Sequence, residues 1–150
     1  MMEDLFDVLS SDDRTLVSEL FEFAIDNNLK CNRSKTKDII YVFSHPKTKE
    51  RIMKFSHSKK QGFMVSLRFN LSESYSTFFS EAIRKTIEEY NYRYTGCYPR
   101  CNKCDGTKGY IYTYPDGRQF FRCYQELINL PNVSFRELDE LKALIMTQIT

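Results

Sequence analysis

Apolar residues near the start of the chain recur at intervals of three and four positions, the spacing that places side chains on one face of an α-helix. Within residues 12–27, Leu16 and Leu20 belong to such a stripe. Ser10 or Ser11 can cap this helix, because a serine side chain accepts a hydrogen bond from a backbone N–H of the first turn. The pattern therefore predicts a first helix that buries one face.

The apolar pattern changes to that of β-strands after a polar connection at residues 31–37. β-Branched and aromatic residues fill positions 38–44, and two further strand-like runs span 50–57 and 62–71. Pro46 separates the first two runs and excludes one uninterrupted strand, because proline has no N–H to donate to a ladder. These segments predict an antiparallel three-stranded meander with one buried face and one face at least partly in water.

Two more helices are predicted, one in the middle of the chain and one near its end. The first begins near Ser72 or Ser74 and carries an apolar stripe as far as Tyr90. The last begins at Ser134, where Ser134 and Glu137 match a capping box. We expect both helices to pack on the sheet.

A β-hairpin is predicted between these two helices. Two β-rich segments, 109–114 and 118–124, flank the turn sequence Pro-Asp-Gly at residues 115–117. The order of elements predicts the α+β class: an antiparallel sheet, made of the meander and the C-terminal hairpin, with three helices packed on it. We expect a single domain over residues 1–150, in which 97–124 forms a cysteine-rich hairpin lobe.

Composition narrows the class of protein. With 150 residues, 41% apolar and 28% charged, the chain is long enough to bury a core, and it is typical of a globular protein. Its apolar runs are all shorter than the ~20 residues of a membrane-spanning helix, which predicts no membrane association. The acidic N-terminus differs from a signal peptide, so we expect a cytoplasmic location, where thiols stay reduced.

Four of the five cysteines lie within 27 positions, as Cys97, Cys101, Cys104 and Cys123. Thiolates at this spacing can converge on one tetrahedral metal ion, because the hairpin returns the last cysteine toward the first three. The segment resembles a zinc ribbon in which the second C-x2-C knuckle is incomplete. We therefore predict a structural zinc site with these four cysteines as ligands.

Other interpretations of the cysteines remain open. They could be buried or exposed thiols without a metal. The spacing of the first three also resembles the iron–sulfur motif of radical S-adenosylmethionine enzymes, although Lys103 replaces the aromatic residue usual in that family, and the chain is too short for its barrel. A redox pair of Cys101 and Cys104 is a third alternative, but a hairpin follows it where thioredoxin-like proteins have a helix.

Charge is unevenly distributed along the chain. Residues 1–29 carry a net charge of −7, whereas residues 30–68 carry +9. A basic block of this kind could follow the phosphates of a nucleic acid, or it could simply be a solvated face that guards strand edges. The candidate ligand-binding residues in this block are Lys47, Lys49, Arg51, Lys54 and Arg68.

Aromatic residues concentrate in the hairpin and the segment before it, since eight of the ten tyrosines lie between residues 90 and 124. Alternation predicts that the hairpin tyrosines share one face, where they could stack on bases or on an aromatic ligand. The alternative is that this face packs inside the protein. The candidate residues here are Tyr110, Tyr112, Tyr114, Arg118 and Arg122.

The leading functional hypothesis is a small binding protein with a structural zinc site and with nucleic acid, or another anionic or aromatic ligand, as its partner. The alternative is a small-molecule-sensing domain or enzyme with a cleft between sheet and hairpin. The enzyme case is weak, because P-loop, G-x-G-x-x-G, H-E-x-x-H and G-x-S-x-G motifs are absent from the sequence. The element order resembles that of small uncharacterised bacterial α+β proteins, a resemblance that implies no activity. The sequence leaves the oligomeric state open.

Overall fold

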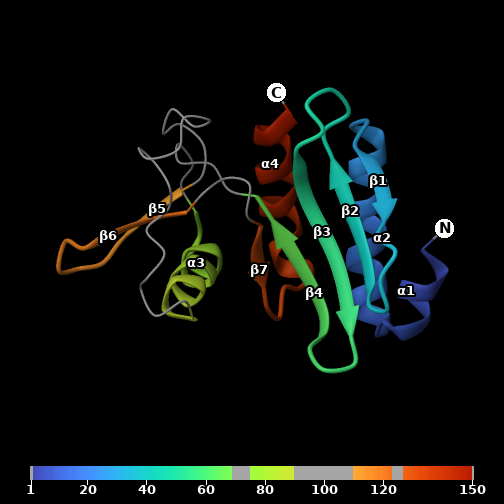
Figure 1. The fold of residues 1–150 in the computed structure, drawn as a ribbon, viewed down its shortest axis with the longest axis horizontal. Coiled ribbons are helices and arrows are strands. Elements are labelled where there is room, and N and C mark those ends of the chain that lie inside the picture. Colours follow the sequence, from blue (N-terminus) through green and yellow to red (C-terminus); the bar gives the residue numbers. More distant parts are fainter. Residues whose placement is uncertain (1, 69–74, 90–109, 123–126, 150) are drawn as a thin grey trace.

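The computed structural model describes residues 2–68, 75–89, 110–122 and 127–149, and it confirms the α+β class (Figure 1). In chain order the elements are α1 (Glu3–Val8), α2 (Ser11–Asp26), β1 (Lys30–Arg33), β2 (Ile39–Ser44), β3 (Arg51–Ser58), β4 (Gly62–Leu67), α3 (Thr77–Glu89), β5 (Tyr110–Thr113), β6 (Gln119–Arg122), β7 (Ile128–Leu130), the 3-10 helix η1 (Phe135–Glu137) and α4 (Leu138–Ile149).

The main sheet has five antiparallel strands in the order β1-β2-β3-β4-β7. The predicted meander forms its centre as β2, β3 and β4. The polar connection predicted at residues 31–37 is wrong in its first part, because Lys30–Arg33 forms the edge strand β1. The predicted hairpin is present, but β5 and β6 form a separate two-stranded sheet and do not extend the main one.

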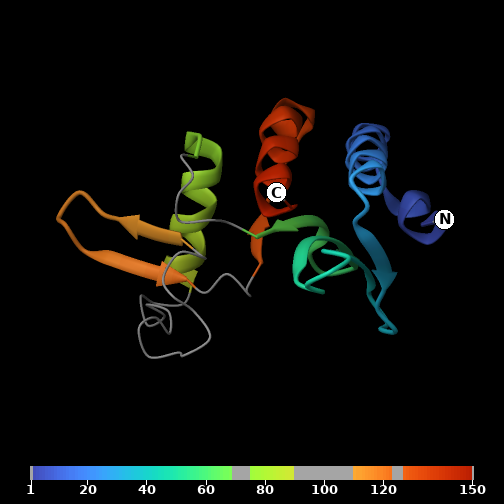
Figure 2. The same ribbon diagram turned by 90° about the horizontal axis from the view of Figure 1, so that it is seen from above.

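Helices α2 and α4 lie on the same face of the main sheet (Figure 2). The apolar stripe of α2, including Leu16 and Leu20, is buried with Phe43 of β2 and Phe55 of β3. Helix α3 lies beside β7, with the β5–β6 hairpin beyond it (Figures 1 and 2). Within the described residues, the opposite face of the main sheet carries no helix (Figure 2).

Two of the three predicted helix starts are confirmed; the middle helix, α3, begins at Thr77, and Ser72 and Ser74 lie outside the described residues. The Ser10 hydroxyl accepts a hydrogen bond from the backbone N–H of Asp13 at 3.2 Å, which caps α2. Ser134 and Glu137 form the capping box at η1, and α4 continues directly from it. None of the described helices combines the length and the apolar character needed to cross a lipid bilayer.

The short helix α1, which sequence patterning did not predict, is attached to the edge of the sheet by one carboxylate. Asp4 accepts a hydrogen bond from the Tyr41 hydroxyl at 2.5 Å and forms an ion pair with Arg33 at 2.8 Å. Leu5 of α1 is fully buried next to this pair. Burial, together with the adjacent Asp4 carboxylate, raises the pKa of Tyr41 to about 12.

A β-bulge in β3 changes which side chains face the core. Phe43 pairs with Met53, but its neighbour Ser44 pairs with Arg51, which leaves Ile52 as the extra residue. Ile52 and Met53 are both fully buried, whereas Arg51 is exposed. The bulge therefore adds a second buried side chain and places Arg51 on the sheet face that α2 and α4 leave uncovered.

Candidate nucleic-acid interface

The face of the main sheet that points away from α2 and α4 carries Lys30 of β1 and Arg51 and Lys54 of β3, and we refer to it as the open face. Lys30 pairs with Ser44, and Ser44 pairs with Arg51, so these three residues form one row across β1, β2 and β3. Their neighbours Cys31, Phe43 and Met53 alternate to the opposite side and pack in the core. Lys30 and Arg51 are exposed at the two ends of this row.

A second row crosses all five strands of the sheet. It consists of Asn32, Val42, Lys54, Ser66 and Asn129, each paired with the next. The Ser66 hydroxyl donates a hydrogen bond to Asn129 Oδ1 at 2.6 Å. Lys54 occupies the centre of the row, on the middle strand, and is half-buried. Val42 is apolar and Ser66 is fully buried, so Lys54 is the single charged side chain of this row.

The electrostatic environment of Lys54 is unfavourable for its own charge. Partial burial lowers the pKa of Lys54, and the nearby Arg51 guanidinium lowers it further. In the described strands no position on the open face is occupied by aspartate or glutamate. A bound anion would favour the charged form of Lys54.

Two further predicted candidates lie in the β2–β3 turn, at the end of the sheet next to Lys30 and Arg51. Lys47 and Lys49 are both exposed there. His45 shapes this turn, because its Nδ1 accepts hydrogen bonds from the backbone N–H groups of Lys47 at 3.1 Å and Thr48 at 3.3 Å. The turn thus extends the positive charge of the open face beyond the strand ends.

The structure removes Arg68 from the candidate surface. Its residue is only 7% exposed, and Arg68 Nε donates a hydrogen bond to Gln148 Oε1 at 2.6 Å. Arg68 Nη1 also forms an ion pair with Glu50. This guanidinium connects β4, the β2–β3 turn and α4 inside the protein, so we do not include Arg68 among the exposed cations of the open face.

The aromatic face of the hairpin packs inside the protein, at least for the residues described. The rings of Tyr112 and Tyr114 meet edge to face at 5.0 Å, and Tyr114 packs on Phe120 at 5.6 Å. The Tyr114 hydroxyl donates a hydrogen bond to Glu88 of α3 at 3.4 Å. Arg118 covers Tyr114 with its guanidinium 5.0 Å from the ring. Tyr114 therefore links the hairpin to α3, while Tyr112 and Arg118 pack against Tyr114, which favours the packing interpretation over the ligand-stacking one.

Several predicted site residues lie where their side chains are not described. Tyr110 and Arg122 pair with each other across the hairpin, which fixes their backbone positions only. The four predicted zinc ligands, Cys97, Cys101, Cys104 and Cys123, lie outside the described residues. The zinc site therefore stays a prediction.

The remaining cysteine is a packed thiol. Cys31 of β1 is half-buried against the core, and burial raises the pKa of its thiol. Within the described ranges, histidine, cysteine and acidic side chains form no group of three or more that could hold a metal ion.

Comparison of the chain with protein-family models, with curated proteins and with solved structures gave no match. Any functional conclusion therefore depends on the surfaces of this chain itself.

Proposed function

We propose that the protein binds nucleic acid through the sugar–phosphate backbone, using the open face of the main sheet and the adjacent β2–β3 turn. The cations that would contact phosphates are Lys30, Lys47, Lys49, Arg51 and Lys54. Because aromatic residues of the described strands β1 to β4 pack on the core side or at its edge, we expect little base stacking on this face and little sequence preference.

The observation that carries this proposal is the position of Lys54. A lysine half-buried in the middle of a sheet, beside an arginine, is unfavourable for folding by itself, as the lowered pKa of Lys54 indicates. Such a charge is useful where an anion binds, because the phosphate restores the electrostatic stabilisation that burial removed. The absence of acidic residues from the face positions of the described strands supports the same conclusion.

The spacing of the cations fits a phosphate chain. Lys30 and Arg51 are separated by two strand spacings, or about 10 Å, and Arg51 and Lys54 by about 10 Å along β3. Charges on one strand of a duplex follow every ~3.4 Å, so neighbouring cations can meet roughly every third phosphate. The exposed lysines of the turn can contact phosphates beyond the sheet.

The test is the salt dependence of binding, measured by fluorescence anisotropy with labelled single-stranded and duplex oligonucleotides. If five cations contact phosphates of a duplex, the slope of log K against log salt should approach about −4.5, a loss of about 500-fold between 50 and 200 mM salt. Replacing Lys30, Arg51 and Lys54 by glutamine should reduce the slope to about −1.8 and that loss to about 12-fold.

The matched control replaces three exposed cations elsewhere, Lys35, Lys85 and Arg136, by glutamine. Both triple variants change the net charge by the same amount, so a general charge effect would weaken them equally. A weaker slope only in the first variant supports binding at the open face. Equal slopes in the two variants, or no salt-dependent binding by the unaltered protein, would contradict the proposal.

We further propose that a structural zinc ion holds the segment 97–124. Support comes from the donor set alone: four thiolates at C-x3-C-x2-C-x18-C spacing match the tetrahedral sulfur coordination that zinc prefers. When bound, the ion would supply folding free energy to this segment and would leave no open position for chemistry.

Native mass spectrometry should detect one zinc ion per chain, and replacing Cys101 or Cys104 by serine should abolish it. Cys31→Ser is the control, because Cys31 is a half-buried thiol on β1 and should leave the metal content unchanged. A fully folded, metal-free protein whose stability does not depend on Cys101 or Cys104 would exclude the structural zinc site.

A further inference from the structure

A groove opens at the end of the sheet opposite to the β2–β3 turn. Three segments surround it: the end of α1, the β1–β2 connection and the β3–β4 turn. Its volume of about 800 Å³ is within the usual range of small-molecule sites, roughly 300–1,000 Å³. No sequence motif marks this region, because its residues come from three separate segments of the chain. The lining residues are Val8, Lys37, Asp38, Ile39, His57, Ser58, Lys59, Lys60 and Gln61.

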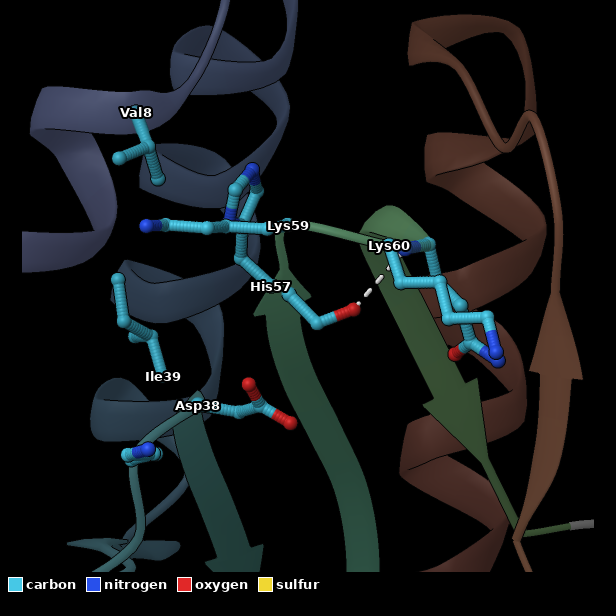
Figure 3. A pocket seen from close by; sticks show the side chains of 9 residues that line it. Val8, Asp38, Ile39, His57, Lys59 and Lys60 are labelled. Atoms are coloured by element: carbon cyan, nitrogen blue, oxygen red, sulfur yellow. Dashed lines mark hydrogen bonds between the residues drawn. The ribbon is translucent and has the colours of Figure 1, made fainter.

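The base of the groove is partly apolar. Ile39 and His57 are paired residues of β2 and β3, and Val8 faces them from the end of α1 (Figure 3). Val8 is 47% exposed, so its side chain is accessible to a ligand in the groove. A ligand with an apolar part would cover this side chain.

The rim of the groove is basic. The Lys59 side chain extends across the groove toward Val8, while Lys60 lines it from the side of β4 (Figure 3). Lys37 contributes a third cation and Asp38 the single carboxylate among the lining residues, so the net charge of the lining is +2 with neutral His57. The groove therefore combines an apolar base with a rim suited to a dianion.

The β3–β4 turn that carries two of these lysines is held in a defined shape. The Ser58 hydroxyl accepts a hydrogen bond from the backbone N–H of Gln61 at 3.0 Å (Figure 3). Gly62 follows with a φ of 73°, a left-handed conformation that glycine adopts without strain. Lys59 and Lys60 are thus attached to a turn whose backbone is fixed, which lowers the entropy lost when they contact a ligand.

We infer that this groove binds a small phosphate monoester with an apolar or aromatic body. A phosphate monoester carries a charge of about −2 near neutral pH, which matches the net charge of the lining. A bare phosphate would leave most of the groove unfilled, whereas an attached apolar body would cover Val8 and Ile39. Lysines suit this ligand because each ammonium group offers three donors to phosphate oxygens.

This groove is separate from the proposed nucleic-acid interface. Ile39 and His57 alternate to the same side as the core residues Tyr41 and Phe55, so the groove lies on the helix side of the sheet. The open face lies on the other side, and its turn lysines are at the other end of β3. The two sites can therefore be tested independently, and either proposal can fail without the other.

The histidines allow a direct test by NMR. The protein contains only two, His57 in the groove and His45 in the β2–β3 turn at the opposite end of the sheet. Titration with phenyl phosphate should shift the imidazole signals of His57 in a saturable manner and leave those of His45 unchanged. Inorganic phosphate should bind about tenfold more weakly, the difference expected if the ring buries roughly 60 Å² of apolar surface.

Two double variants provide a reciprocal control. Lys59→Gln with Lys60→Gln should reduce the affinity for phenyl phosphate at least tenfold, whereas Lys47→Gln with Lys49→Gln should leave it unchanged. Each variant removes two exposed lysines from a turn of the same sheet, so the loss of net charge is equal. An oligonucleotide bound at the open face should not shift His57.

A third variant should increase the affinity of the groove for phenyl phosphate, where the two double variants test for a loss. Asp38→Asn removes the only carboxylate of the lining and should increase the affinity for phenyl phosphate several-fold, because it removes a repulsive charge. Equal shifts of both histidines, equal affinities of the two double variants, or equal binding of phenyl phosphate and inorganic phosphate would each overturn the assignment. No saturable shift of His57 in the unaltered protein would do so as well.

Discussion

Replacing Tyr41 by phenylalanine tests how α1 is held on the sheet. Among the described residues, the Asp4 carboxylate contacts the Tyr41 hydroxyl, the Arg33 guanidinium and the backbone N–H of Leu5, the last at 2.9 Å. Phenylalanine keeps the ring of Tyr41 but removes the hydrogen bond. Any change in stability therefore measures that single contact, because the packing of the 9%-exposed residue is preserved.

At neutral pH we expect the substitution to lower the free energy of unfolding by about 1.5 kcal/mol. A hydrogen bond to a charged group contributes roughly 1.5–3 kcal/mol. We expect a value at the lower end of this range, because Asp4 keeps its ion pair with Arg33 and the Asp4 side chain is 40% exposed to water.

The effect should change sign at high pH. The pKa of Tyr41 is about 12 in the folded protein against 10.0 for an ordinary tyrosine, so between these values the folded state binds more protons than the unfolded one. Stability contributed by neutral Tyr41 is therefore complete below pH 10 and is lost as pH rises toward 12. By pH 12 this loss reaches about 2 kcal/mol in the unaltered protein and is absent in the variant, which should then be at least as stable.

The effect of Tyr41→Phe on stability at low pH depends on Asp4, the hydrogen-bond partner of Tyr41. The Tyr41 hydrogen bond, and then the Arg33 guanidinium, lower the pKa of Asp4 below its ordinary value of 3.8. A carboxyl group with a lowered pKa contributes stability above its unfolded pKa, and this is lost as pH falls through the folded pKa. The difference between the two proteins should therefore also decrease in strongly acidic solution.

Urea denaturation followed by circular dichroism from pH 3 to pH 12 measures this difference. Circular dichroism of the backbone is preferable to fluorescence, since the chain has no tryptophan and tyrosine emission itself changes on ionisation. Tyr112→Phe is the control, because the Tyr112 hydroxyl makes no hydrogen bond among the described residues, and its substitution should show no sign change. A constant difference between Tyr41→Phe and the unaltered protein from pH 7 to pH 12 would refute the reasoning.

Two further predictions concern charged residues of the sheet and can be measured by the same denaturation experiment. Arg68→Ala should destabilise the protein by about 2–3 kcal/mol, because it leaves the Glu50 carboxylate and buried Gln148 without this partner. The exposed ion pairs of Arg84 make Arg84→Ala a control that should cost less than about 1 kcal/mol. Lys54→Met should stabilise the protein by roughly 0.5 kcal/mol at neutral pH while weakening nucleic-acid binding. Burial lowers the pKa of Lys54, so the unaltered lysine loses its charge as pH rises through that pKa, and the stability gained by Lys54→Met should then shrink. A gain in stability that does not depend on pH would contradict this explanation.

Strong local periodicity made the central elements predictable. Helix α2 and strands β2, β3 and β4 carry long apolar patterns, and the sequence predicted each of them within a few residues of its observed start. Strand β1 was missed because its sequence, Lys-Cys-Asn-Arg, is polar and its only buried contact is made by Cys31 on one face. Strand β7 has three residues and forms only by pairing with β4, a distant segment that leaves no local signal.

The candidate site shows the same division between local and distant information. The sequence revealed a basic block, but it could not separate Lys54, which lies on the open face, from Arg68, which is buried against α4. Both follow apolar strand residues, and what distinguishes them is that Arg68 has partners in other segments, Glu50 before β3 and Gln148 80 residues later. The sequence also could not predict on which face of the sheet Arg51 lies, because that depends on the β-bulge at Ile52, which the alternation of apolar and polar residues does not reveal.

The pairing of β4 with β7 has a consequence for the order in which the protein folds. Leu67 and Ile128 are direct partners in the sheet. The roughly 60 residues between them therefore form one long connection, an excursion from the main sheet whose two ends lie side by side. Strands β1 to β4 are joined by short turns and can pair early, whereas β7 must wait for a long loop to close. We therefore expect a late folding step in which β7 joins the meander and brings α4 onto its face. Whatever shortens or rigidifies the excursion should accelerate that step and leave the earlier pairing of β1 to β4 unchanged.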